Sequence, residues 1–201
     1  MVRSMKTRLR NAIADGKLVR LSDKITTKTI SNKLNKPINF NSPVAMSVLS
    51  EAEWLLRVTE GYVGTVGGHH LEDIIAAVAP KSGWEVQKVG RKVDLKNSRI
   101  KKIVMLKTQP STFNHSSKMG DEEKASQASR KDYELFSVVF FHPGHQSIIQ
   151  ELFGFSASDI DEIKQFAVDE ARAARAKYEK LFKQHPLYNT VVGELACQLG
   201  W

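Results

Sequence analysis

Apolar residues return at helical spacing through the first part of this 201-residue chain. Residues 4–14 predict a short basic helix, and residues 22–34 predict a second one with a serine as its N-cap. Residues 43–60 predict a third helix, because an Asn-Ser-Pro start signal precedes an apolar face. Glycines follow at positions 61, 64, 67 and 68 and are expected to end it. A new helix is predicted over residues 69–79.

The middle of the chain changes to a strand-like pattern. Residues 84–89 alternate between apolar and polar side chains, and the strand is expected to continue over 93–95 after a kink. Residues 100–108 predict the next strand. Residues 134–141 are almost all apolar and predict a buried strand. The polar segment between them, residues 110–131, predicts a loop followed by a polar helix.

The last part of the chain predicts helices again. Residues 156–184 predict a long helix with one apolar face and a serine cap, and residues 187–198 predict a final helix after a proline. Helices, a small sheet and further helices predict an α/β (α+β) fold, with a small central mixed sheet flanked by helices and a helical C-terminus. We expect a basic N-terminal arm over residues 1–40 and one domain over 41–201.

Positive charge is concentrated in two segments. Residues 1–40 hold ten Lys and Arg against two Asp, and residues 81–107 hold nine Lys and Arg against two acidic residues. Local positive charge attracts polyanions, so the sequence favours nucleic acid as the partner. The chain has no apolar run of membrane-span length and one cysteine, and its first ten residues are too charged to be expected to act as a secretory signal. These features predict a cytoplasmic protein without an intrachain disulfide.

The hairpin expected over residues 84–108 carries the candidate chemistry. Asp94 lies near the end of its first strand and Lys107 near the end of its second, thirteen residues further on. This spacing suits a tight hairpin that brings the two side chains together. A carboxylate can hold a divalent metal, and a lysine can orient or deprotonate the attacking water and face a phosphate. The pair predicts a metal-dependent nuclease.

With these residues the chain resembles the PD-(D/E)XK nuclease superfamily, and within it the small type II restriction endonucleases, over about residues 70–141. The resemblance implies a helix with an acidic residue, a strand aspartate, a (D/E)-x-Lys strand, a crossover helix and another strand. Glu72, Asp94 and Lys107 match the catalytic positions, but Met105 occupies the acidic position two before the lysine. The resemblance then leaves three alternatives. Mg2+ is held by Asp94, Glu72 and the main-chain carbonyl of Met105; or the missing carboxylate comes from elsewhere in the chain; or the site is inactive.

The same resemblance implies a homodimer that cleaves double-stranded DNA at a specific sequence, since a palindromic site matches two-fold protein symmetry. DNA contacts are expected from the basic strip, residues 81–107, and from the polar loop that follows the second strand. The candidate DNA-binding residues are Arg91, Lys92, Lys101, Lys102, Gln109, Ser111, Thr112, Asn114 and His115.

Several alternatives remain open at this point. Asp94-Leu95-Lys96 is a rival Asp-x-Lys motif with Glu85 upstream. The segment can also be a plain basic hairpin in which Asp94 pairs with Lys92 or Lys102. A non-catalytic DNA-binding protein that uses the basic arm is the second hypothesis, and Met105 is the residue that favours it. An RNA-binding or structural protein is the third.

Overall fold

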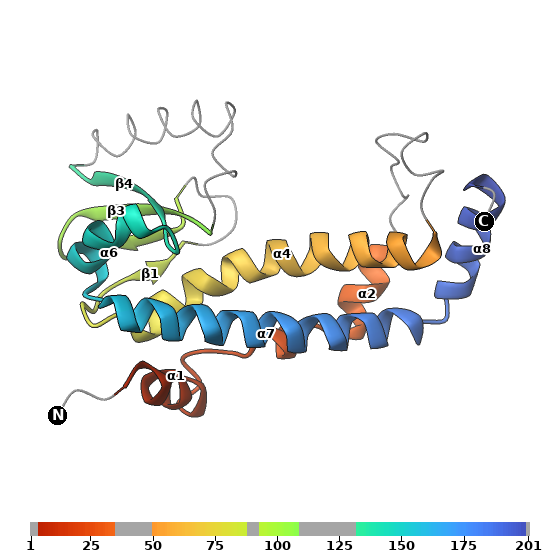
Figure 1. Cartoon of the computed structure of the whole chain (residues 1–201), viewed down its shortest axis with the longest axis horizontal. Helices are drawn as coiled ribbons and strands as arrows, with labels where there is room; N and C mark the ends of the chain where they lie inside the picture. The colour runs from red at the N-terminus through yellow and green to blue at the C-terminus, as the bar shows by residue number, and fades with distance from the viewer. Residues whose placement is uncertain (1–3, 35–49, 88–92, 109–131, 200–201) are drawn as a thin grey trace. The chain divides into compact units, whose positions relative to one another are not determined.

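The computed structural model describes residues 4–34, 50–87, 93–108 and 132–199 (Figure 1). The chain divides into two compact units. The first comprises residues 1–18 and 68–167, and the second comprises residues 19–67 and 168–201. The expected loop and helix over residues 110–131, and the helix start near residue 43, lie outside the described residues.

The first unit holds a mixed four-stranded sheet in the order β1-β2-β3-β4. Its strands are β1 (Glu85–Val86), β2 (Leu95–Asn97), β3 (Lys102–Lys107) and β4 (Glu134–Val139). β1, β2 and β3 pair antiparallel, and β3 pairs parallel with β4. The predicted class, helices around a small mixed sheet, is therefore confirmed. The hairpin of the described residues is shorter than expected and has β1 as a separate strand.

One face of this sheet is the core face. Leu95, Val104, Leu106 and Val138 are buried in one cluster with apolar residues of the surrounding helices. Those helices are α1 (Met5–Ala14), the part of α4 (Glu51–Val78) within this unit, α6 (Gln146–Phe153) and the start of α7 (Ala157–Lys183). The strand predicted over residues 134–141 is confirmed as β4, but only its last two residues are buried.

The helix predicted over residues 156–184 is confirmed as α7, and its cap explains where it begins. Ser156 Oγ accepts a hydrogen bond from the Asp159 amide at 3.2 Å, while Asp159 Oδ2 accepts one from the Ser156 amide at 2.9 Å. This reciprocal capping box satisfies two amides that the helix itself leaves without a partner. α1 also follows its prediction, with Ser4 as the N-cap.

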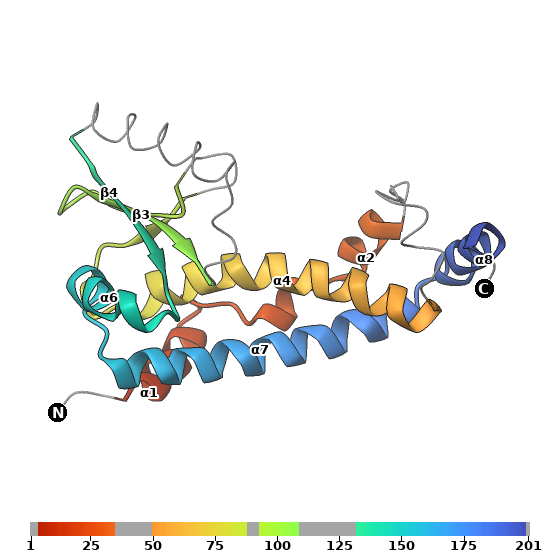
Figure 2. The same ribbon diagram turned by 45° about the horizontal axis from the view of Figure 1, so that its top comes forward.

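The break expected at the four glycines is wrong. α4 runs from Glu51 to Val78 without interruption (Figure 2). Each glycine costs roughly 1 kcal/mol relative to alanine inside a helix. Buried residues on both sides offset that cost: Trp54 and Leu55 in the second unit, and Leu71 and Ile74 in the first. Tertiary packing therefore decides the length of this helix.

The second unit is helical in its described part. It contains the 3-10 helix η1 (Leu21–Lys24), α2 (Thr27–Leu34), the first part of α4, most of α7, and α8 (Tyr188–Leu199). The single helix predicted over residues 22–34 is thus two short helices. Glu170 of α7 is buried and accepts hydrogen bonds from the Leu21 amide at 2.7 Å and from Arg20 at 3.1 Å.

The N-terminal segment is not the poorly buried arm that its charge suggested. Met5 and Leu9 of α1 are 0% and 2% exposed in the core of the first unit, and Leu21 and Ile30 are 1% and 0% exposed in the second. The basic residues therefore decorate a folded segment. Among the described helices, none is both long and apolar enough to cross a lipid bilayer.

Candidate active site

Asp94 lies just before β2, at the end of the hairpin away from its turn. Its main chain joins the sheet, because its amide donates to the Val104 carbonyl and its carbonyl accepts from the Gln87 amide. Its side chain bonds to β3 as well: Oδ2 accepts a hydrogen bond from the Leu106 amide at 2.7 Å. The carboxylate is therefore fixed beside the last residues of β3.

Glu72 reaches the same place from α4. The residue is 7% exposed, and its pKa is raised to about 7, first by burial and then by the negative charge of Asp94. Burial and a like charge both disfavour the ionised carboxylate. This electrostatic interaction indicates that α4 and the hairpin bring the two carboxyl groups near one another.

His69 is a third member of this group, and the sequence analysis missed it. Its Nδ1 lies 3.2 Å from Glu72 Oε1, and its ring is mostly exposed. The His69 interaction opposes the rise in the pKa of Glu72, but burial and Asp94 outweigh it. His69 and Glu72 both lie in the helix predicted over residues 69–79, and their spacing of three residues is the signal that could have indicated this contact.

Lys107 ends β3, directly after the residue that Asp94 binds. Side chains alternate along a strand, and Val104 and Leu106 face the core, so Met105 and Lys107 face the other side. The ladder pairs Leu95 with Val104, but this register does not continue to Asp94, because the Asp94 amide also bonds to Val104, through its carbonyl. Alternation therefore does not assign Asp94 to the face of Lys107, and Glu72 reaches Asp94 from α4, whose Leu71 and Ile74 pack on the core face. Within the described part of the chain, no ion pair joins them.

The Met105 main-chain carbonyl, which was expected as a metal ligand, is less suitably directed than the carbonyl of Leu106. The Lys107 carbonyl accepts from the Phe140 amide, so it points toward β4, and the Met105 carbonyl two residues earlier points the same way. The amide of Leu106 points toward Asp94, and its carbonyl shares that direction. Leu106 therefore offers the carbonyl on the side of the carboxylates, while the Met105 side chain is 2% exposed.

These donors fit a magnesium ion. Mg2+ is usually bound through one or two carboxylates, and water fills its other positions. Glu72 and Asp94 supply two carboxylates, and a divalent cation between them would relieve the repulsion that raises the pKa of Glu72. The described residues contain no group of three or more His, Cys, Asp or Glu side chains arranged to hold a metal.

The rival Asp94-Leu95-Lys96 motif does not bring its aspartate and lysine side chains together. Glu85 and Lys96 are register partners between β1 and β2, and the Lys96 ammonium lies over the Tyr133 ring, 4.8 Å from its centre. Lys96 thus interacts near the turn of the hairpin, while the Asp94 carboxylate binds β3 at the other end.

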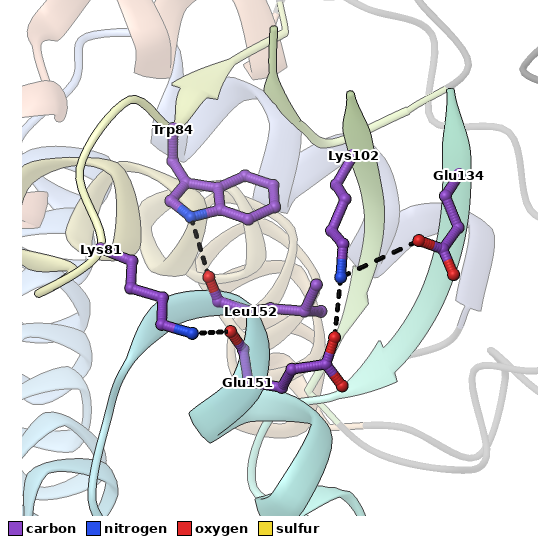
Figure 3. A network of polar contacts seen from close by, with 6 residues as sticks. All are labelled: Lys81, Trp84, Lys102, Glu134, Glu151 and Leu152. Carbon is purple, nitrogen blue, oxygen red and sulfur yellow. Dashed lines mark hydrogen bonds and ion pairs between the residues drawn. The ribbon is translucent and has the colours of Figure 1, made fainter. Parts of the chain in front are cut away.

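The basic strip is partly neutralised by acidic residues from other elements. Lys102 Nζ lies 2.7 Å from Glu151 Oε1 and 3.8 Å from Glu134 Oε2, and its side chain is only 20% exposed (Figure 3). Lys81 donates to the Glu151 carbonyl in the same network. Lys102 is therefore a weaker candidate for DNA binding than Lys101, which is exposed at the turn.

Lys101 is the other expected DNA contact that lies in the described residues. Lys101 adopts a positive φ of 55° and its ammonium lies 5.0 Å from the centre of the Tyr133 ring. The remaining candidates lie outside the described residues: Arg91, Lys92, Gln109, Ser111, Thr112, Asn114 and His115.

Comparison of the chain with models of protein families, with curated proteins and with solved structures finds no match.

Proposed function

We propose that this chain is a Mg2+-dependent DNA endonuclease whose active site contains Glu72, Asp94 and Lys107. One observation carries the proposal: Glu72 is buried on a helix and interacts electrostatically with Asp94 of the hairpin, and burial first, with the Asp94 charge second, raises the pKa of Glu72 to about 7. Such perturbed carboxyl groups cluster at functional sites. A pair of this kind beside a strand-ending lysine is the donor set that metal-dependent phosphodiester hydrolysis uses.

The order and direction of the elements support a restriction-endonuclease-like core. An acidic helix, α4, precedes three antiparallel strands, and β4 then returns parallel to β3. Parallel neighbours require a crossover connection, and residues 108–133 supply it. The described helix and strands are compatible with the order that the resemblance to the PD-(D/E)XK superfamily implies, and the expected crossover helix lies outside the described residues.

In this site Glu72 and Asp94 would hold Mg2+, and the Leu106 carbonyl would be the candidate main-chain donor. Held there, the ion would supply a water of lowered pKa and would offset the charge of the scissile phosphate. Lys107 orients the attacking water and faces the negative charge that develops at phosphorus. The attacking water gives a proton to solvent as the new P–O bond forms and the bond to the leaving oxygen breaks, and the leaving oxygen takes a proton from solvent. A homodimer on a palindromic duplex is part of the proposal.

A non-catalytic DNA-binding protein is the second candidate, and Met105 is the observation that favours it. The side chain at the expected acidic position is a buried thioether, which offers no hard oxygen to Mg2+. In this reading Glu72 and Asp94 are remnants of a metal site, and the basic surface alone acts.

Plasmid cleavage with and without Mg2+ tests the two candidates. Asp94→Asn and Lys107→Ala should each lower cleavage by about 100-fold or more, because each removes a group aimed at the transition state, while duplex binding persists. Asp161→Asn and Lys164→Ala are the matched controls, since both residues are exposed on α7. Equal activity in all four variants would refute the proposed site.

Met105→Glu tests the missing carboxylate directly. If the site is a functional nuclease centre, the added oxygen donor should raise both Mg2+ affinity, measured by calorimetry, and cleavage rate. Circular dichroism should confirm that the Met105→Glu variant is folded, because the substituted side chain is buried. If the wild type and a folded Met105→Glu variant both bind duplex DNA but cut none with Mg2+ or Mn2+, the non-catalytic function stands.

A further inference from the structure

The turn between β4 and α6 holds two histidines whose rings are fixed by the main chain. His145 Nδ1 accepts a hydrogen bond from the Val139 amide at 2.9 Å, and His142 Nδ1 accepts one from the Gly144 amide at 3.1 Å. The rings meet edge to face, with centres 5.4 Å apart. A Cβ at position 144 would lie 3.2 Å from the His142 ring, so glycine lets that ring pack against the turn.

These hydrogen bonds decide the tautomer of both rings. A nitrogen that accepts from a main-chain amide carries no proton, so the neutral ring carries its proton on Nε2. Both rings therefore present an Nε2–H donor on the side away from the turn. The same arrangement disfavours metal binding, since an Nε2 that carries a proton has no lone pair for a metal.

The turn lies at the edge of the sheet where Lys107 ends β3. Val139, whose amide binds His145, is the register partner of Lys107, and the Phe140 amide donates to the Lys107 carbonyl at 2.9 Å. Figure 2 shows the ends of β3 and β4 side by side. The histidines thus lie on the far side of β4 from the carboxylates, beside the end of the sheet that holds the candidate active site.

The chemistry of the turn suits an anion. Residues 142–147, His-Pro-Gly-His-Gln-Ser, contain no carboxylate, and the first turn of α6 contains no acidic residue. His142, Gln146 and Ser147 are exposed. Main-chain bonds from the His142 amide to the Val139 carbonyl and from the His145 amide to the His142 carbonyl hold the turn in one shape, so little ordering is needed for binding.

We propose that His142 and His145 bind backbone phosphates of the nucleic acid that flank the phosphate at the active site, through their neutral Nε2–H groups. The inference rests on the proposed function in that it takes nucleic acid as the ligand. Neutral donors add affinity without releasing counterions, so they should not contribute to the salt dependence of binding. This property distinguishes them from the lysines of the basic strip.

The test uses paired substitutions at both positions. Asparagine places an amide oxygen where Nδ1 accepts, so it keeps the turn but has no group at Nε2. Glutamine reaches the Nε2 position and keeps a donor there. Duplex affinity of the full chain is measured by fluorescence anisotropy without divalent metal, over a series of salt concentrations, so that the result does not depend on cleavage.

His142→Asn with His145→Asn should weaken duplex binding by about tenfold or more, as expected for lost hydrogen bonds to a charged group, with an unchanged salt slope. The glutamine pair should retain most of the affinity. Unchanged affinity in the asparagine pair would overturn the inference. So would a salt slope reduced by about one unit per histidine, which indicates a charged ring. Nitrogen NMR of the free protein should show the Nε2–H tautomer at both rings, and the Nδ1–H tautomer would also overturn the inference.

Failure of the proposed nuclease is distinguishable from failure of this inference. A wild type that binds duplex DNA but never cuts it overturns the nuclease alone, and loss of affinity in the asparagine pair then still supports the phosphate contact. A wild type that binds no duplex overturns both. Inorganic phosphate serves as a second probe: if it perturbs the ring resonances and competes with DNA only weakly, the contact belongs to a longer phosphate backbone.

Discussion

Glu72 should make the stability of this protein fall as the pH rises, and Glu72→Gln should remove that fall. The pKa of Glu72 in the folded chain is about 7, against an ordinary value of 4.5. Between these values the folded state binds more protons than the unfolded state, so raising the pH favours unfolding. The stabilisation is complete below about pH 4.5 and is lost as the pH passes through about 7.

The size of the effect follows from the same difference. One pKa unit corresponds to about 1.36 kcal/mol, so the free energy of unfolding should fall by roughly 3 kcal/mol across this range. Glutamine keeps the shape and remains neutral at every pH in the range. The variant should therefore match the wild type at the acidic end and exceed it at the neutral end.

Urea unfolding followed by circular dichroism, repeated from acidic to neutral pH, measures the difference between the two proteins. Glu60→Gln is the control, because Glu60 is an exposed glutamate on the same helix. Carboxyl NMR titration of Glu72 gives its pKa directly. An identical pH dependence in the wild type and Glu72→Gln, or a Glu72 that titrates at its ordinary value, would refute the burial and charge argument.

Further predictions concern two buried residues, the salt dependence of DNA binding and the effect of Mg2+ on stability. Leu9→Ala should cost about 2–5 kcal/mol of unfolding free energy in urea, because Leu9 is buried in the core and its loss leaves a cavity; a cost near zero would mean that α1 is a dispensable arm. Glu170→Ala should cost about 1–3 kcal/mol by the same measurement, since it leaves the buried Leu21 amide without its acceptor, whereas Arg20 is half exposed and stays solvated. Duplex binding should weaken steeply as salt rises, and a flat dependence by anisotropy would exclude nucleic acid as the main partner. Added Mg2+ should raise the unfolding temperature more above the pKa of Glu72 than below it, because metal binds the deprotonated carboxylate.

Local signals were sufficient for some elements. α1 and α7 begin at serine caps and bury an apolar face at helical spacing, so each could be predicted within a residue or two. The strand that became β4 was visible as a run of apolar residues. Caps and periodicity act between residues a few positions apart, and a single sequence contains that information in full.

The glycines of α4 show where local signals failed. Glycine propensity is a local cost of about 1 kcal/mol per residue, whereas the burial that offsets it comes from residues brought in by distant segments. Tyr178, for example, stacks on Tyr62 of α4 at 4.8 Å between ring centres. Neither the partner nor the area buried can be obtained from the helix segment itself.

The candidate site divides in the same way. The sequence by itself determined the types of residue, two carboxylates and a lysine, and their order along the chain. Only the tertiary structure brought Glu72 to Asp94, gave Lys102 its acidic partners, and directed the Leu106 carbonyl rather than that of Met105 toward the carboxylates. The physical reason is that charge repulsion, burial and hydrogen-bond direction depend on distances of a few ångströms between segments far apart in the chain. Those distances are set when the core packs.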